Sequence, residues 1–201
     1  MNKKILLVGL ASLLLIAGVA AAVFLFSSPA GFRGTTYGEP YPVAKDIELS
    51  RSNGSRFQLS QLRGKAVLLF FGYTSCPDVC PTTLAELKQA LEELGEDRAK
   101  QVQVLFVTVD PARDSPERVQ AYVNQFNPNF IGLSGTESEL LQVWHNYGVF
   151  REIVDGSSAA GYIVNHTARV TLIDQEGNMR VSFAFETPVE DIVHDLKLLL
   201  R

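Results

Sequence analysis

The stretch that decides the fold reads Phe70-Phe71-Gly72-Tyr73-Thr74-Ser75-Cys76-Pro77-Asp78-Val79-Cys80-Pro81-Thr82-Thr83-Leu84, and it holds both cysteines of the 201-residue chain. An apolar run from Ala66 to Phe71 leads into it, and leucines at helical spacing follow Pro81. This pattern predicts a buried strand that passes through a short loop into a helix. Open α/β folds bind their ligands at such crossings, so we expect the chemistry of this chain here.

The two prolines give the loop a predicted geometry. Proline is favoured at the first helical position, so Pro81 is predicted to begin the helix with Cys80 as its N-cap. The positive end of the helix dipole would then stabilise a thiolate and lower the pKa of Cys80. Three residues separate Cys76 from Cys80, and the two sulfurs can approach closely enough for a disulfide or for two bonds to one metal ion.

Three interpretations of this cysteine pair compete at this point. A static disulfide would close so short a loop that it would restrain the unfolded chain little. A thiol–disulfide exchanger of thioredoxin type has two residues between its cysteines, whereas this chain has three. A soft-metal site is the third interpretation, and a third ligand would decide between it and the other two.

The amino terminus predicts a membrane anchor. Lys3 and Lys4 precede an uncharged run from Ile5 to Phe26, which is long enough as a helix to cross a bilayer with the lysines in the cytoplasm. A cleaved signal peptide is the alternative, since small residues at 20–22 could be a cleavage site. Both interpretations place the rest of the chain outside the cytoplasm, and the lack of a transit-peptide composition favours a bacterial plasma membrane.

The predicted organisation has three parts: a cytoplasmic stub and anchor over 1–26, a tether over 27–44 and a folded domain over 45–201. The tether is predicted from its content of Gly, Pro, Ser and Thr without apolar periodicity. The net charge of −4 and the average charged content give no sign of nucleic-acid binding. The domain is predicted to be α/β and thioredoxin-like, with a mixed central sheet flanked by helices and an N-terminal β-hairpin. Its predicted strands are 46–49, 56–58, 66–71, 102–109, 127–133, 149–154, 168–173 and 180–185.

Of the three histidines, His166 is the candidate third ligand. His145 and His194 lie within predicted helices beside polar neighbours, and we expect both on solvated helix surfaces. His166 follows a loop bounded by glycines, 156–161, and precedes a core strand, which places it at a strand mouth on a segment predicted to move. Two thiolates suit Cu(I), and an added imidazole suits Cu(II). Zinc fits the ligand types, but the sequence shows no acid–base partner for hydrolysis.

Three aspartates near these residues have plainer predicted roles. Asp78, inside the cysteine loop, could approach Cu(II), but a solvated turn residue is the favoured interpretation. Asp110 and Asp114 precede a helix that Ser115 is predicted to cap, and we expect them to cap or to fix their loop rather than to line the site.

At these residues the sequence resembles the Sco/SenC family of copper-binding assembly factors. The resemblance covers the chain from about Val43 to its end, and its motifs are Gly72-Tyr73-Thr74-Ser75-Cys76-Pro77-Asp78-Val79-Cys80-Pro81, Asp110-Pro111-Ala112-Arg113-Asp114-Ser115-Pro116-Glu117 and His166-Thr167. It implies copper bound through Cys76, Cys80 and His166. One departure is Asn165, where the family often has an aspartate, and this puts in doubt a charged partner that would orient the histidine.

The resemblance also implies partners and two functions that use the same sulfurs. One is delivery of copper to the CuA site of cytochrome c oxidase subunit II, with a periplasmic copper donor upstream. The other is reduction of the cysteines of that site by a thiol–disulfide oxidoreductase, which would need a thiol reductant and would make the protein an enzyme. Peroxide scavenging ranks last, because the sequence shows no arginine beside the cysteine motif.

Overall fold

A computed structural model describes residues 13, 15–19, 31–158 and 161–201. The chain divides into two units, Met1–Gly31 and Phe32–Arg201. Residues 13 and 15–19 are helical, and no helix within the described ranges is long and apolar enough to cross a membrane. The predicted stub, most of the predicted anchor and positions 27–30 of the predicted tether lie outside the described residues.

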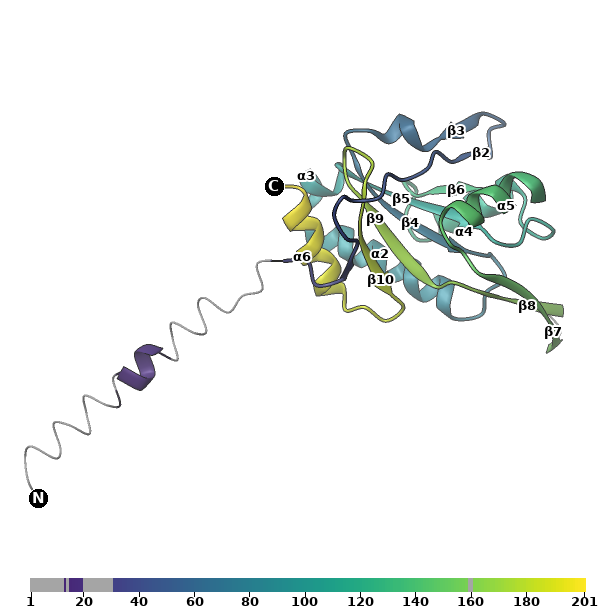
Figure 1. Cartoon of the computed structure of the whole chain (residues 1–201). Coiled ribbons are helices and arrows are strands. Elements are labelled where there is room, and N and C mark those ends of the chain that lie inside the picture. The colour runs from purple at the N-terminus through teal and green to yellow at the C-terminus, as the bar shows by residue number, and fades with distance from the viewer. Residues whose placement is uncertain (1–12, 14, 20–30, 159–160) are drawn as a thin grey trace, which may run out of the picture. The chain divides into compact units, whose positions relative to one another are not determined.

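The second unit is built on a six-stranded sheet with β4 near its centre (Figure 1). The strands lie in the order β1 (Thr35–Thr36), β10 (Met179–Ala184), β9 (Arg169–Ile173), β4 (Ala66–Gly72), β5 (Val102–Thr108) and β6 (Ile131–Leu133). β4 runs parallel to β5 and antiparallel to β9, and every residue of β4 is buried. A strand that is covered on both faces reads as a continuous apolar run, which is why this strand could be predicted from the sequence alone.

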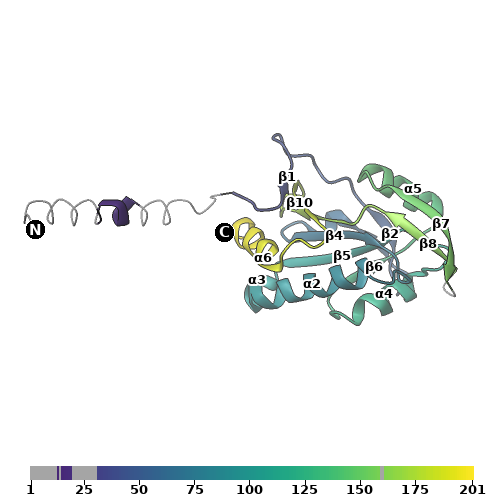
Figure 2. The ribbon, with the colours of Figure 1, turned by 90° about the horizontal axis from the view of Figure 1, so that it is seen from below.

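Helices cover both faces of the sheet (Figure 2). Two successive crossovers, β4 to β5 through α2 and β5 to β6 through α4, step in the same direction, and right-handed crossovers therefore place both helices on one face. The other face carries α5 and the hairpin of β2 and β3. The remaining bounds are α2 (Val79–Leu94), α3 (Glu96–Ala99), α4 (Pro116–Asn124), α5 (Glu137–Asn146), α6 (Val189–Leu199), β2 (Glu48–Ser50), β3 (Arg56–Gln58) and the 3₁₀ turn η1 (Leu59–Leu62).

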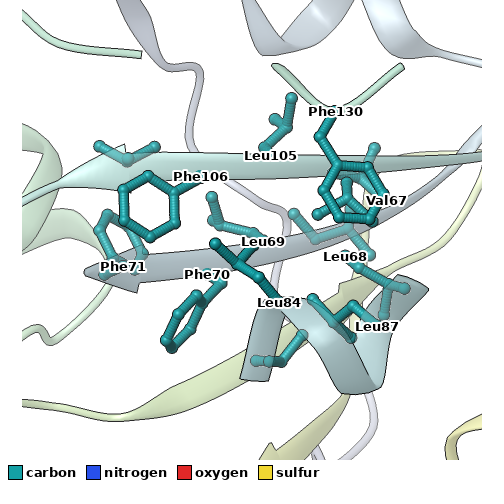
Figure 3. Packing of buried hydrophobic residues seen from close by; sticks show 14 of the residues in the cluster. Val67, Leu68, Leu69, Phe70, Phe71, Leu84, Leu87, Leu105, Phe106 and Phe130 are labelled. Atoms are coloured by element: carbon teal, nitrogen blue, oxygen red, sulfur yellow. The ribbon is translucent and has the colours of Figure 1, made fainter. Parts of the chain in front are cut away.

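Alternation along β4 divides the core between these two faces. Phe70 packs edge-on against Phe106, with ring centroids 5.8 Å apart, on the face that α2 covers with Leu84 (Figure 3). Phe71 points to the opposite face and contacts Tyr147 at the end of α5, at 5.7 Å between ring centroids. This two-layered core confirms the predicted mixed α/β architecture with an N-terminal hairpin.

The structure differs from the prediction at residues 32–44, which belong to the folded unit rather than to a tether. β1 pairs with β10 in antiparallel register, and Val43 forms a further bridge to Asn178. The buried carboxylate of Asp195 accepts hydrogen bonds from the backbone of Arg33 and Gly34, at 2.8 and 2.9 Å. The pairing with β1 satisfies backbone groups of β10 that would otherwise lie at an open edge of the sheet. The sequence of 27–44 alone does not reveal this partner.

A second difference concerns the segment predicted as a glycine-bounded loop. β7 (Arg151–Ser158) and β8 (Gly161–His166) pair with each other as a separate two-stranded sheet. Most of the predicted loop 156–161 therefore lies in strands, and only 159–160 falls outside the described residues. His166 is the last residue of β8.

Gly132 tests how tightly α4 packs on the sheet. A Cβ at this position in β6 would lie 2.8 Å from the backbone carbon of Val119 and 2.9 Å from the backbone nitrogen of Gln120. Backbone atoms cannot rotate away, so we expect Gly132→Ala to lower the free energy of unfolding in urea by about 1–3 kcal/mol. Gly38→Ala is the matched control, because a Cβ there meets nothing within 4 Å. Equal unfolding free energies for the two variants would contradict this packing.

Candidate functional site

The site begins where β4 ends. A Cβ on Gly72 would lie 2.8 Å from the sulfur of Cys80 and 2.7 Å from the ring of Phe106. Only glycine therefore lets the Cys80 sulfur rest against the end of the central strand. Cys80 is fully buried, Cys76 is half-buried, and both thiols are free.

The helix starts two residues earlier than predicted. α2 begins at Val79 with Asp78 in the N-cap position, so Cys80 and Pro81 lie inside the first turn. Proline fits this turn as well as the first helical position, because the first N–H groups of a helix have no intrahelical acceptor. The prediction of Cys80 as the N-cap is therefore wrong. The Cys80 N–H instead points out of the helix and donates to the sulfur of Cys76, at 3.4 Å.

This geometry assigns different protonation states to the two thiols. The pKa of Cys76 is lowered to about 4, first by the hydrogen bond from the Cys80 side chain, then by hydrogen bonds with His166 and the backbone, which outweigh its burial. The pKa of Cys80 is raised, first because its thiol donates to Cys76, and further by burial and by the negative charge of Cys76. The thiolate at the positive end of the helix is thus Cys76, whereas the sequence predicted Cys80.

The third predicted residue, His166, reaches the same place from β8. Its Nε2 lies 3.8 Å from the sulfur of Cys80, and its Nδ1 lies 3.1 Å from the carbonyl oxygen of Thr167. The Tyr73 ring meets the imidazole edge-on, with centroids 5.8 Å apart. The structure therefore brings together all three side chains that the sequence singled out, from segments 86 residues apart.

A cavity of about 210 Å³ opens beside these side chains. Asp78 and Asn165 are exposed and lie at its lining, so the predicted solvated position of Asp78 is confirmed. Within the described part of the chain, no three or more His, Cys, Asp and Glu side chains already form a metal-holding cluster. A nitrogen at about 2.0 Å and a sulfur at about 2.3 Å from the same metal ion lie roughly 3.5–4 Å from each other. The 3.8 Å between the His166 Nε2 and the Cys80 sulfur fits this spacing.

The buried carboxylate of Asp114 fixes the cysteine loop through hydrogen bonds. It accepts hydrogen bonds from the backbone N–H of Thr74 at 3.0 Å, from the Thr74 hydroxyl at 2.6 Å and from the Thr108 hydroxyl at 2.7 Å. Asp114 has no exposed surface. The sequence predicted that Asp114 caps the helix or fixes its own loop, whereas the loop that its carboxylate holds is the one that carries the cysteines.

Two arginines that the sequence reasoning missed also lie at the site. Arg118 donates from Nε to the Thr74 hydroxyl at 2.8 Å and from Nη2 to the Ser75 hydroxyl at 3.2 Å. Arg113 lies over the Tyr73 ring, with its Cζ 5.6 Å from the ring centroid. No arginine lies beside the cysteine motif along the sequence, but the fold brings Arg118 to Thr74 and Ser75 of that motif. The order of elements could have indicated both arginines, because they follow β5, and the loops after the parallel strands β4 and β5 open at the same edge of the sheet.

The other two histidines take no part in this cluster. His145 is exposed on α5, as predicted. His194 is half-buried on α6, where its Nδ1 lies 2.9 Å from a carboxylate oxygen of Asp195.

The SCO1/SenC family model matches residues 35–201, which includes the cysteine loop and the hairpin with His166. The chain belongs to the SCO1/SenC family. The match begins at β1, in agreement with the structural boundary rather than with the predicted one. Sco homologues include copper-bound structures and cytochrome c oxidase assembly proteins.

Known Sco proteins resemble the chain over most of its length. Apo Sco1 of Thermus thermophilus is 39% identical with a TM-score of 0.76, and the match covers 86% of this chain and 99% of that one. ScoI of Bradyrhizobium japonicum, solved with copper bound, is 36% identical with a TM-score of 0.70, covering 78% and 99%. A SCO2-like protein of Rickettsia felis is 33% identical over 189 residues, 91% of this chain and 92% of its own length.

The unequal thiols predict unequal reactivity in the reduced, metal-free protein. With a pKa of about 4, Cys76 is a thiolate between about pH 6 and pH 8, so the rate of its alkylation by iodoacetamide should hardly change over this range. Cys80, whose pKa is raised, should react slowly. Mass spectrometry of the alkylated peptides measures both rates. Cys80→Ala removes the main hydrogen bond to Cys76 and should make its alkylation rise with pH. Two thiols that become reactive together near their ordinary pKa of about 8.5 would contradict the assignment.

Proposed function

We propose that this protein binds copper through Cys76, Cys80 and His166 and delivers it to the CuA site of cytochrome c oxidase subunit II. The observation that carries the proposal is the approach of the His166 Nε2 to 3.8 Å from a free cysteine thiol at the end of the central strand. Membership of a family with copper-bound members supports it.

The ligand types match both oxidation states of copper. Thiolates are soft ligands that suit Cu(I), and imidazole nitrogen adds a ligand that suits Cu(II). Because the pKa of Cys76 is already low, binding at neutral pH requires the loss of a proton from Cys80 only. The sulfur of Cys76, which accepts from the N–H of Cys80, would complete the set.

Release of copper follows from the same arrangement. Cys76 is half-buried beside the open cavity, so a thiolate of an acceptor protein can reach an ion held there and displace the ligands one after another. Oxidation to a disulfide uses both sulfurs, and copper binding and the disulfide therefore exclude each other. The redox state of the two cysteines would gate the loading of copper.

A second candidate function is reduction of a disulfide in the CuA site, and the contrast between the two thiols favours it. The half-exposed Cys76 thiolate attacks one sulfur of the partner's disulfide, and a mixed disulfide forms as the other partner sulfur leaves as a thiolate. Cys80 then loses its proton and attacks the Cys76 sulfur, which releases the reduced partner and leaves a Cys76–Cys80 disulfide. A thiol reductant must restore the pair after each cycle.

The proposed setting is the outer face of a bacterial plasma membrane. The apolar run from Ile5 to Phe26, with Lys3 and Lys4 before it, supports a single-pass anchor with the domain outside the cytoplasm. A copper donor or a thiol reductant of that compartment would supply the site.

Single substitutions separate the contributions of the three ligands. Cys76→Ser and Cys80→Ser should each abolish stoichiometric copper binding, whereas His166→Ala should keep Cu(I) and lower the affinity for Cu(II) by about 10- to 100-fold. Competition titrations with chelators measure both affinities. His145→Ala is the matched control, because His145 lies exposed on α5. Full Cu(II) affinity in His166→Ala would refute the role of the histidine.

Trapping distinguishes delivery of copper from thiol reduction. Cys80→Ser retains the attacking sulfur but lacks the resolving one, so a reductase would accumulate a mixed disulfide with the CuA domain. Such a product, together with a copper affinity weaker than that of the acceptor, would favour the second function.

A further inference from the structure

The hairpin that carries His166 has no backbone hydrogen-bonded ladder to the central sheet. β7 and β8 pair only with each other among the described strands. Besides the two-residue connection from His166 to β9, the position of His166 relative to the cysteines therefore depends on the contacts that fix this hairpin to the rest of the domain.

Tyr162 in β8 makes several of these contacts. Its hydroxyl donates to a carboxylate oxygen of Asp110 at 2.7 Å, and its carbonyl oxygen accepts from Nη1 of Arg113 at 3.0 Å. The guanidinium of Arg113 also lies over the Tyr162 ring, 3.8 Å from its centroid, and pairs with Asp110. Asp110 has no exposed surface, and a buried carboxylate is stable only when such donors satisfy it.

These three residues, which we name the clasp, connect the hairpin to the cysteine side of the site. Asp110 lies just after β5, and Arg113 also covers the ring of Tyr73, which precedes the cysteines and packs against His166. Tyr162 and His166 are four residues apart in one strand, and the even positions of β8 are its less exposed face. Their side chains therefore point to the same side, and a shift of one moves the other.

We propose that the clasp of Asp110, Arg113 and Tyr162 positions His166 as a copper ligand and thereby sets the preference of the site for Cu(II) over Cu(I). This inference rests on the proposed function, because it takes His166 as a ligand. The two sulfurs suffice for Cu(I), whereas Cu(II) also needs the nitrogen. Loosening the clasp should therefore weaken Cu(II) binding and leave Cu(I) binding unchanged.

Tyr162→Phe tests the clasp with the smallest change, since it keeps the ring and the carbonyl contact and removes one hydroxyl. We expect the affinity for Cu(II) to fall by about 10-fold, with an altered electron paramagnetic resonance spectrum of bound Cu(II). The affinity for Cu(I) should stay that of the wild type. Arg113→Lys, which keeps the charge but loses the planar stack, should show the same pattern.

Tyr41→Phe is a close control. The Tyr41 hydroxyl also donates to a carboxylate, that of Glu39 at 2.8 Å, and its ring also lies under an arginine, Arg180 at 4.0 Å. Tyr41 makes none of the contacts of the clasp, so its loss should leave both affinities and the spectrum unchanged.

A measurement without copper tests the positioning itself. Backbone amide hydrogen exchange over β8 should be faster in Tyr162→Phe than in the wild type and in Tyr41→Phe. Adding Tyr162→Phe to His166→Ala should cost no further Cu(II) affinity, because both changes act through the same ligand.

The possible outcomes separate the inference from the function beneath it. If His166→Ala weakens Cu(II) binding and Tyr162→Phe does not, the clasp proposal is overturned while the copper proposal stands. Equal losses of Cu(I) and Cu(II) affinity in Tyr162→Phe would also overturn it, because they indicate general damage to the site. A wild-type protein that binds no copper would remove both proposals.

Discussion

The buried carboxylate of Asp114 supports the arrangement of the cysteine loop. The carboxylate accepts hydrogen bonds from one amide and two hydroxyl groups at the ends of β4 and β5. The backbone carbonyl oxygen of Asp114 also accepts a hydrogen bond from the Ser134 hydroxyl, at 2.6 Å. A charge without solvent contact is costly unless its donors hold their places, so the carboxylate fixes the loop that follows β4. The loop in turn sets Cys76 against the N–H of Cys80.

The site is therefore built from a rigid part and an accessory part. The two cysteines lie in the loop and the first helical turn that follow the central strand, where Gly72 leaves room for the Cys80 sulfur. The histidine comes from a hairpin that side chains, rather than a shared sheet, fix in place. Under the proposed function, Cu(I) would need only the two sulfurs of the rigid part, whereas Cu(II) would also need the imidazole of the accessory part. Such a division would suit the proposed function, in which the site holds copper and also releases it.

Much of this could be predicted from the sequence, for reasons that concern particular residues. The run from Ala66 to Phe71 is apolar throughout because β4 is covered on both faces, and the cysteines could follow it only into the loop at the sheet edge. Two observations point to His166 in the sequence: it lies at the mouth of a predicted strand, and it matches a motif of the family that the chain resembles. The chain does belong to that family, and the ring does lie at the cysteines.

The errors have physical reasons as well. Pro81 is tolerated throughout the first helical turn, so its presence could not fix which cysteine faces the helix end. Residues 35–44 look like a tether because their partner strand, β10, lies some 140 residues away in the sequence. Arg113 acts through contacts with Tyr73 and Tyr162, and only the order of strands in the sheet, not the sequence around it, could indicate that it lies near the cysteines.

X-ray absorption spectroscopy at the copper edge tests the central claim most directly, because it identifies the atoms bound to the ion. The protein loaded with Cu(I) should show two sulfur neighbours, and the protein loaded with Cu(II) should show the same two sulfurs with an added imidazole nitrogen. Copper surrounded by nitrogen and oxygen alone, in a protein whose two thiols are reduced, would contradict the account.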